Sequence, residues 1–118
     1  MAKILIVDDD PGIAVVASAL LTAEGHEVET LESARDAAAR LRRADVDLAI
    51  VDFDVAKREG LDLAEAITST PALDETALIG VAFDVQQIPL ELVDLAVQKP
   101  YATEELGAIV RRVLQDEG

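Results

Sequence analysis

Five short apolar runs recur along the chain, at residues 4–7, 28–31, 48–51, 77–82 and 95–97. The first, third and fourth runs are continuous rather than alternating, which is typical of strands that are covered on both faces. Between the runs lie helix-like stretches, at residues 11–24, 34–43, 61–69 and 104–116. This alternation predicts an α/β fold in which a doubly wound, five-stranded parallel sheet lies between two layers of helices, a three-layer sandwich.

Residues at the ends of the helix-like stretches support these boundaries. Pro11 suits the first turn of a helix, and Gly25 suits the position that follows one. Ser33 and Thr103 are placed to cap the helices that begin after them.

One connection departs from the regular pattern. Residues 84–94 join the fourth run to the fifth, and Pro89 lies in the middle of them. Proline interrupts a helix, so at most a turn or two of helix has room to form on either side of it. We therefore expect the fourth helix of the fold to be shortened or degenerate.

Length, charge and composition limit the classes of function. The 118 residues predict a single domain over 1–118, and 24 acidic against 10 basic residues give a formal net charge of −14. Nucleic acid and anionic membranes would repel such a surface; a hard cation or a basic partner fits it better, although a solvated acidic surface accounts for the charge as well. The chain has no cysteine and one histidine, which excludes disulfides, thiolate nucleophiles and multi-histidine metal sites. No apolar run approaches the ~18 residues of a membrane span and the N-terminus lacks a signal-peptide pattern, so we expect a cytoplasmic protein.

Charged residues gather where the predicted strands end. The first run leads into Asp8, Asp9 and Asp10. The third leads into Asp52 and Asp54, and the fifth leads into Lys99. The carboxyl ends of parallel strands form the ligand-binding edge of an open sheet. Carboxylates that converge there repel each other unless a cation is present, and Mg²⁺ prefers such oxygen ligands. The alternative is that these acids are turn and capping residues, which explains Asp10 well.

These residues together resemble the receiver domains of bacterial two-component response regulators. The motifs are ILIVDDD at 4–10, LAIVD at 48–52, Gly60 eight residues after Asp52, and QKPY at 98–101. Each motif is weak alone, but their order and spacing are highly specific. The resemblance covers essentially the whole chain and implies a flavodoxin-like fold.

The resemblance implies a role for each matching residue. Asp9 would be a direct Mg²⁺ ligand, Asp8 would bind the ion through water, and Asp54 would offer its backbone carbonyl. Asp52 would be the phosphoacceptor and would give one oxygen to the metal, and Lys99 would pair with the phosphoryl group. The implied donor is a phosphohistidine of a histidine kinase or histidine phosphotransfer protein, and the implied output is binding to a downstream protein target as a monomer or weak dimer.

Three positions depart from the pattern of these receiver domains. Ala82 stands where the family has a Ser or Thr that grips a phosphoryl oxygen, and Phe83 replaces a very small residue, so we expect it to crowd the site. Ala96 stands where the family has the aromatic residue that changes position on phosphorylation. The resemblance therefore implies an intact metal and acceptor side with the hydroxyl and aromatic switch missing.

Two other functions fit parts of the sequence. A phosphorylation-independent pseudo-receiver, acting as a docking module, would explain the three departures. A phosphatase of the haloacid dehalogenase type would explain Asp52-Phe53-Asp54-Val55, in which the first Asp is a nucleophile. That family needs further motifs over ~100 residues downstream, and here the paired acids come before Asp52, so we expect a phosphoacceptor rather than an enzyme. With no output domain after Gly118, we expect a stand-alone domain that acts by binding proteins.

The first predicted helix has an uncharged outer face. From residue 4 to residue 34 the chain contains no Lys or Arg. Ile13, Val16, Ala17 and Leu20 supply the predicted core stripe, yet Val15, Ala19 and Thr22 on the other faces are uncharged too. Because a surface helix normally exposes charged residues, these three predict a docking face for a protein partner.

Overall fold

The computed structural model describes residues 2–43, 45–70 and 75–117. Within them one sheet has the strand order β2-β1-β3-β4-β5, and every neighbouring pair is parallel. The strands are β1 (Lys3–Val7), β2 (Glu27–Leu31), β3 (Leu48–Asp52), β4 (Ala77–Ala82) and β5 (Leu95–Gln98). The predicted doubly wound parallel sheet is confirmed.

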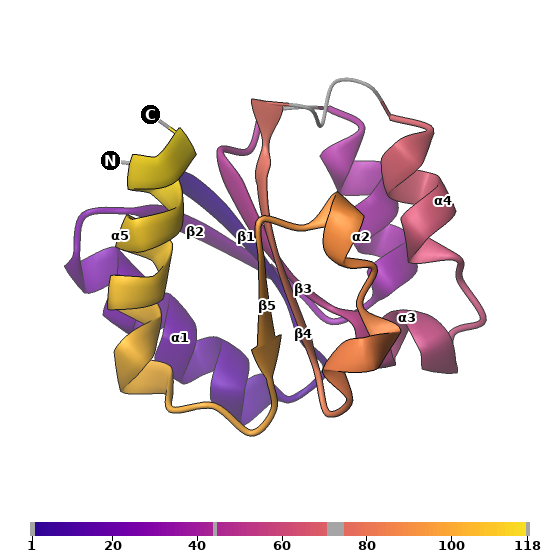
Figure 1. Ribbon diagram of the computed structural model, residues 1–118. Coiled ribbons are helices and arrows are strands. Elements are labelled where there is room, and N and C mark those ends of the chain that lie inside the picture. Colours follow the sequence, from indigo (N-terminus) through magenta and orange to yellow (C-terminus); the bar gives the residue numbers. More distant parts are fainter. Residues whose placement is uncertain (1, 44, 71–74, 118) are drawn as a thin grey trace.

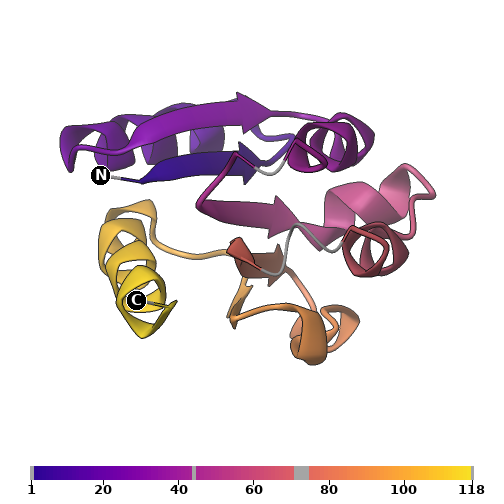
Figure 2. The ribbon, with the colours of Figure 1, turned by 90° about the horizontal axis from the view of Figure 1, so that it is seen from above.

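Helices cover both faces of this sheet (Figure 1). On one face lie α1 (Pro11–Ala23) and α5 (Leu106–Glu117); on the other lie α2 (Ala34–Leu41), α3 (Phe53–Arg58) and α4 (Leu63–Thr68). The view from above shows the three layers, with the sheet between the two groups of helices (Figure 2). None of the helices in the described ranges is long and apolar enough to cross a membrane.

The continuous apolar runs serve two separate cores. Alternate strand residues point to opposite faces of a sheet. On β1, Ile4 and Ile6 pack in the core under α1 and α5, whereas Leu5 and Val7 pack in the core under α2 and α3. Strands buried on both sides need apolar residues at every position, which is why β1, β3 and β4 show no polar alternation.

The predicted core stripe of α1 is only partly confirmed: Ala17 is fully buried and Ile13 is partly buried, but the other two residues are exposed. Its buried residues are Ala14, Ala17 and Leu21. Val16 and Leu20, predicted to be in the core, are 46% and 36% exposed. Because α1 is apolar around most of its circumference, its sequence pattern does not fix which face turns inward.

The predicted helix boundaries hold at α1 and α2 but not at α5. The Asp10 side chain accepts hydrogen bonds from two amides at the start of α1, Gly25 follows that helix with a φ of 96°, and Ser33 caps α2. Thr103 makes no such cap: it begins a 3₁₀ turn over Thr103–Glu105, and α5 starts from that turn at Leu106.

The α3 helix was not predicted from the sequence. It begins directly after β3, and the helix predicted over 61–69 is the separate helix α4. Gly60, with a φ of 70°, follows α3 and turns the chain away.

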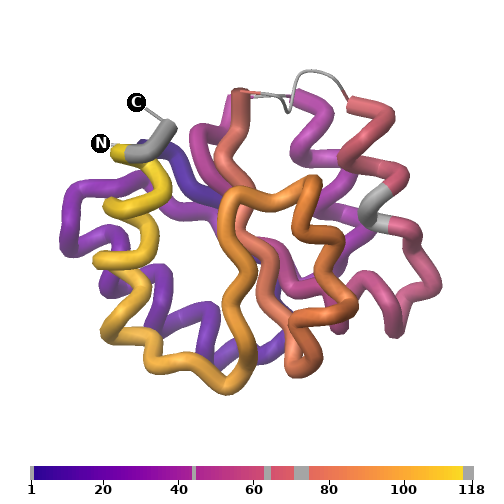
Figure 3. Tube along the Cα trace, in the orientation of Figure 1, coloured from indigo at the N-terminus to yellow at the C-terminus, as the bar shows by residue number. Residues whose placement is uncertain are grey.

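The connection between β4 and β5 forms no α-helix. It contains two 3₁₀ turns, η2 (Val85–Gln87) and η3 (Leu90–Leu92), with Pro89 between them. Figure 3 shows this segment, in orange, on the same side of the sheet as α2 and α4. The predicted degenerate fourth helix is confirmed. Ile88, which is buried between the two turns, holds the segment against the sheet.

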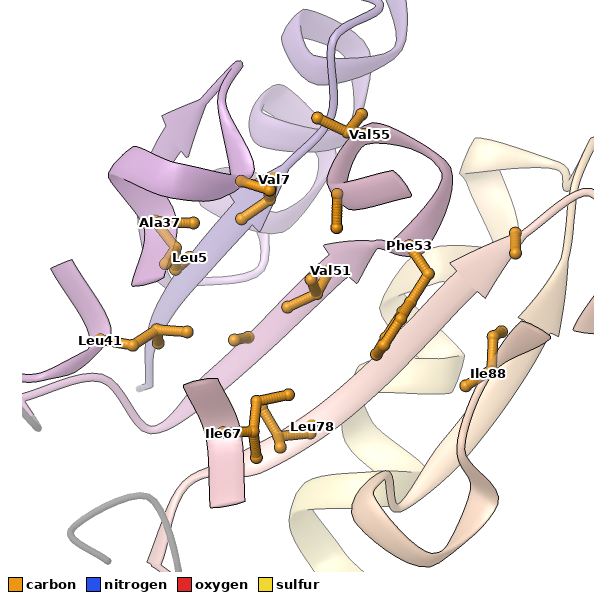
Figure 4. Packing of buried hydrophobic residues seen from close by; sticks show 14 of the residues in the cluster. Leu5, Val7, Ala37, Leu41, Val51, Phe53, Val55, Ile67, Leu78 and Ile88 are labelled. Atoms are coloured by element: carbon orange, nitrogen blue, oxygen red, sulfur yellow. The ribbon is translucent and has the colours of Figure 1, made fainter. Parts of the chain in front are cut away.

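A glycine in β4 allows this close approach. A Cβ atom built at Gly80 would lie 2.8 Å from Ile88 Cγ2 and 3.0 Å from Phe53 Cε1. Figure 4 shows the side chains of Phe53 and Ile88 in this part of the core. Gly80 therefore provides the space into which the shortened connection packs.

We expect Gly80→Ala to lower the free energy of unfolding by about 1–3 kcal/mol, because the added methyl overpacks a filled core. Chemical denaturation monitored by circular dichroism measures this. The matched control is Gly107→Ala in α5, where the added Cβ meets the flexible Glu24 carboxylate. That variant should be neutral, or more stable by up to about 1 kcal/mol from helix propensity. Equal stability of Gly80→Ala and the wild type would contradict this account of the packing.

Candidate functional site

Three carboxylates meet at the carboxyl edge of the sheet. Asp8 and Asp9 follow β1, and Asp52 ends β3, the neighbouring strand. One carboxylate oxygen from each lies within 4.8 Å of the others. Asp52 is fully buried, Asp8 is buried and Asp9 is exposed. The topology therefore brings together the acids that the sequence predicted to converge.

Asp52 is held on two sides. Its Oδ1 accepts hydrogen bonds from the amides of Asp54 at 2.9 Å and Val55 at 3.3 Å, since Asp52 is the N-cap of α3. Its Oδ2 accepts a hydrogen bond from Lys99 Nζ at 2.7 Å. The carboxylate thus has a fixed orientation and a cation at the oxygen that faces away from α3.

Lys99 brings its ammonium group from the end of β5 to these acids. Its side chain is 9% exposed; Nζ lies 3.3 Å from Asp54 Oδ2 and 4.7 Å from the centre of the Phe83 ring. Burial disfavours the charge of Lys99, but the hydrogen bonds and charges of Asp52 and Asp54 together outweigh it, and the pKa of Lys99 is raised. Lys99 therefore stays charged, as its predicted role requires.

The side chain of Asp54 has a role that the sequence did not indicate. Its Oδ2 accepts a hydrogen bond from the Phe83 amide at 3.0 Å in addition to pairing with Lys99. Asp54 thereby ties the start of α3 to the end of β4. The predicted role of its backbone carbonyl as a metal ligand stays a prediction.

The charge of Asp8 is poorly tolerated at this edge. Burial raises its pKa, and the charges of Asp52 and Asp9 add to this effect. The Asp10 amide, which donates to Asp8 Oδ1 at 2.9 Å, and the charge of Lys99 oppose it. A bound cation at this edge, in addition to the cations of the chain, would favour the ionised form of Asp8.

A cavity of about 270 Å³ opens at this edge of the sheet. Its lining includes Asp8, Asp9, Arg58, Lys99 and Tyr101. The Tyr101 hydroxyl is buried and forms no hydrogen bond within the described part of the chain. Burial, with the charges of Asp8 and Asp52, raises the pKa of Tyr101 to about 12, so this group stays a neutral donor.

Arg58 supplies a second cation at the cavity. It is the last residue of α3, and its guanidinium forms an ion pair with Asp9. Arg58 was not among the predicted site residues, because α3 was not predicted. An Arg six residues after Asp52 carries no signal until the intervening residues are known to be helical.

The donor set fits Mg²⁺. It consists of carboxylate oxygens, which this ion prefers, and one oxygen from each of the three acids lies within 4.8 Å of the others. Mg²⁺ usually keeps several waters. Water in the cavity would also satisfy the buried Tyr101 hydroxyl, since buried polar groups are usually hydrogen-bonded.

The α1 helix borders a second hollow. A groove of about 630 Å³ is lined by Val15, Ala19 and Thr22 of α1 and by Thr30 and Leu31 at the end of β2. Val15 is 68% exposed, and Ala19 and Thr22 are exposed as well. The lining also includes Asp8, so the groove adjoins the acidic edge.

The family model of the response regulator receiver domain matches residues 4–111. The chain belongs to this family. It is 33% identical over 118 residues to the heme response regulator HssR of Staphylococcus saprophyticus, which covers 98% of this chain and 52% of that protein. It is 32% identical over 122 residues to the sensory transduction protein RegX3 of Mycobacterium tuberculosis, which covers 100% of this chain and 53% of that protein. The chain thus spans about half the length of these curated relatives.

Solved receiver domains have the same fold. The chemotaxis response regulator CheY4 of Vibrio cholerae superposes with a TM-score of 0.82 at 27% identity, covering 96% of this chain and 98% of that one. A CheY-like receiver domain protein from Methanospirillum hungatei gives a TM-score of 0.82 at 23% identity. The receiver domain fold predicted from the sequence motifs is confirmed.

Two of the three positions that the sequence predicts to be atypical, Ala82 and Phe83, contact Lys99. Ala82 is fully buried, and its carbonyl accepts a hydrogen bond from the Lys99 amide at 2.8 Å. Phe83 is 61% exposed and lies beside the Lys99 ammonium group, so it lines the cavity from its rim rather than filling it. Ala96 of β5 is half-buried and offers only a methyl group to the core.

Asp8→Asn should raise the thermal unfolding midpoint of this receiver domain at pH 7 without divalent cations. The raised pKa of Asp8 means that the folded state binds the proton more tightly than the unfolded state, so the ionised group costs folding free energy at neutral pH. Asn keeps an oxygen for the Asp10 amide but carries no charge. The gain should shrink as the pH falls through the raised pKa toward the ordinary value of 3.8, where both states hold the proton.

The exposed neighbour provides the control for this measurement. Asp9→Asn should leave the midpoint unchanged or lower it slightly, because it removes only an exposed ion pair. A lower midpoint for Asp8→Asn than for the wild type at pH 7 would contradict the conclusion that the charge of Asp8 destabilises the folded state.

Proposed function

We propose that this receiver domain accepts a phosphoryl group on Asp52 in a Mg²⁺-dependent reaction. The donor would be a phosphohistidine of a histidine kinase or histidine phosphotransfer protein, and the output would be binding to a downstream protein target. The observation that carries this proposal is the arrangement of Asp52, which lies beside two further acids and is paired with the buried Lys99.

The reaction exchanges one bond to phosphorus for another. A carboxylate oxygen of Asp52 forms a bond to phosphorus while the bond between phosphorus and the imidazole nitrogen of the donor breaks. The imidazole leaves with that electron pair. Two α3 amides hold Oδ1 of Asp52, so Oδ2, the oxygen that accepts from Lys99, is the better placed nucleophile.

The chain's own residues would stabilise the charge that the phosphoryl group brings. Lys99 would turn from the Asp52 carboxylate to a phosphoryl oxygen, which is a short movement because the two groups become joined. Asp8, Asp9, Asp52 and the Asp54 carbonyl would hold Mg²⁺. When bound, this ion would neutralise negative charge on both the acids and the phosphoryl group.

Incubation with a small phosphodonor and Mg²⁺ should add the mass of one phosphoryl group to the intact protein. Asp52→Asn should abolish this addition, and removal of Mg²⁺ with a chelator should do the same for the wild type. A parallel measurement follows the unfolding midpoint, which should rise with Mg²⁺ in the wild type by mass action but not in Asp9→Ala. Phosphorylation of Asp52→Asn to the same extent as the wild type would refute the assignment of the acceptor.

A phosphorylation-independent docking module is the second candidate function, and Ala82 and Ala96 favour it. Ala82 offers no hydroxyl to a phosphoryl oxygen, and Ala96 has no ring to reorient. A phosphoryl group shifts a conformational equilibrium only through contacts that differ between its two states. Absence of any mass increase, with Mg²⁺ present, would favour this second function.

The α1 groove is the proposed docking face for the phosphodonor. Its lining combines exposed apolar positions with the acidic Asp8 and Glu32, and none of the lining residues is basic. A helical partner with basic residues around an apolar patch would be complementary to it. Docking there would bring a phosphohistidine to the edge that holds Asp52.

Ala19→Lys should reduce phosphotransfer from the partner by at least about tenfold, because docking would bury an unpaired charge. Phosphorylation by the small donor should be retained. The matched control is Ala39→Lys on α2, which adds the same charge at an exposed position on the other side of the sheet. Circular dichroism confirms that both variants fold. Equal partner-driven rates for wild type and Ala19→Lys would exclude this face.

A further inference from the structure

Three of the acids at the carboxyl edge form ion pairs with two cations of the chain itself. Lys99 pairs with Asp52 and Asp54, and Arg58 pairs with Asp9. Both cations line the cavity that Asp8 and Asp9 also line. Any divalent ion that binds Asp9 and Asp52 must therefore compete with positive charge that is already in place.

The two cations differ in how firmly they are held. The Lys99 side chain is 9% exposed, contacts two carboxylates and lies beside the Phe83 ring. The Arg58 side chain is 56% exposed, and its ion-pair partner Asp9 is exposed as well. An exposed ion pair contributes little, so Arg58 is the cation that leaves at low cost.

We propose that Arg58 is a built-in competitor for the divalent cation, which occupies Asp9 until Mg²⁺ displaces it. This inference rests on the proposed function, because it assumes that Asp8, Asp9 and Asp52 bind Mg²⁺. Arg58 would lower the affinity of the site in two ways: it blocks a ligand oxygen, and its charge repels the incoming ion. It is a positioning residue that sets the Mg²⁺ concentration at which the site fills.

The position of Arg58 in α3 makes the competition local. The helix begins at the cap formed by Asp52 and ends at Arg58, so both ends of one short helix contact the acid cluster. Without a bound ion, the positive charge next to Asp9 is the Arg58 guanidinium. When Mg²⁺ binds, the ion would take the place of that guanidinium. A displaced guanidinium would remain at the rim of the cavity.

Titration calorimetry with Mg²⁺ alone tests this on the unphosphorylated protein. Arg58→Gln should bind Mg²⁺ about three- to tenfold more tightly than the wild type, and the difference should shrink at high salt. Arg58→Lys keeps the charge and should stay within about twofold of the wild type. A second readout is the NMR signal of the Arg58 Nε–H group, which should shift toward that of a free arginine as Mg²⁺ is added.

Lys57→Gln is the matched control, because it removes the same charge from the preceding position of α3. Lys57 is exposed and lines a different pocket, with Phe53 and Gln87. Equal gains in affinity for Lys57→Gln and Arg58→Gln would show that only the net charge matters and would overturn the proposal. So would wild-type affinity in Arg58→Gln.

The same titration separates this inference from the proposed function. If the wild type binds no Mg²⁺, the proposed metal site fails and the competition fails with it. If the wild type binds Mg²⁺ and Asp9→Ala does not, while Arg58→Gln matches the wild type, the metal site stands and only the role of Arg58 is refuted.

Discussion

Repulsion among three carboxylates is the constraint on which this edge of the molecule depends. Carboxylate oxygens within 4.8 Å of one another, two of them on buried residues, repel one another strongly when they are charged. The compensation is local and comes from several elements. The α3 amides serve Asp52, the Asp10 amide serves Asp8, and the cations reach in from the ends of β5 and α3. The loops at this edge are therefore arranged around one cluster of negative charge.

The sheet and its acids could be predicted from the sequence because they depend on local patterns. Continuous apolar runs mark strands that are buried on both faces, and the position of an acid after a strand fixes the edge to which it belongs. Pro89 likewise limits the helix content of its segment wherever that segment packs. These features need no knowledge of distant contacts.

The missed features all depend on tertiary contacts. The α3 helix is only six residues long, and it exists because Asp52 caps it and Phe53 and Val55 pack into the core. The face that α1 turns to the sheet carries Ala14, Ala17 and Leu21, and the pattern of a helix that is apolar on most sides does not specify that face. The Asp54 side chain contacts the residues that directly follow β4 and β5, 29 and 45 positions away in the chain.

The α3 helix also fixes a spacing. Asp52 is its N-cap and belongs to the acid cluster, and Arg58 is its last residue and pairs with Asp9 of the same cluster. Each residue of an α-helix turns the chain by about 100°. Insertion or deletion of a single residue between them would therefore swing the guanidinium far around the helix axis and away from Asp9, even if every strand of the sheet stayed in place. In this molecule the number of residues between Asp52 and Arg58, as much as their identity, determines which charged groups come into contact.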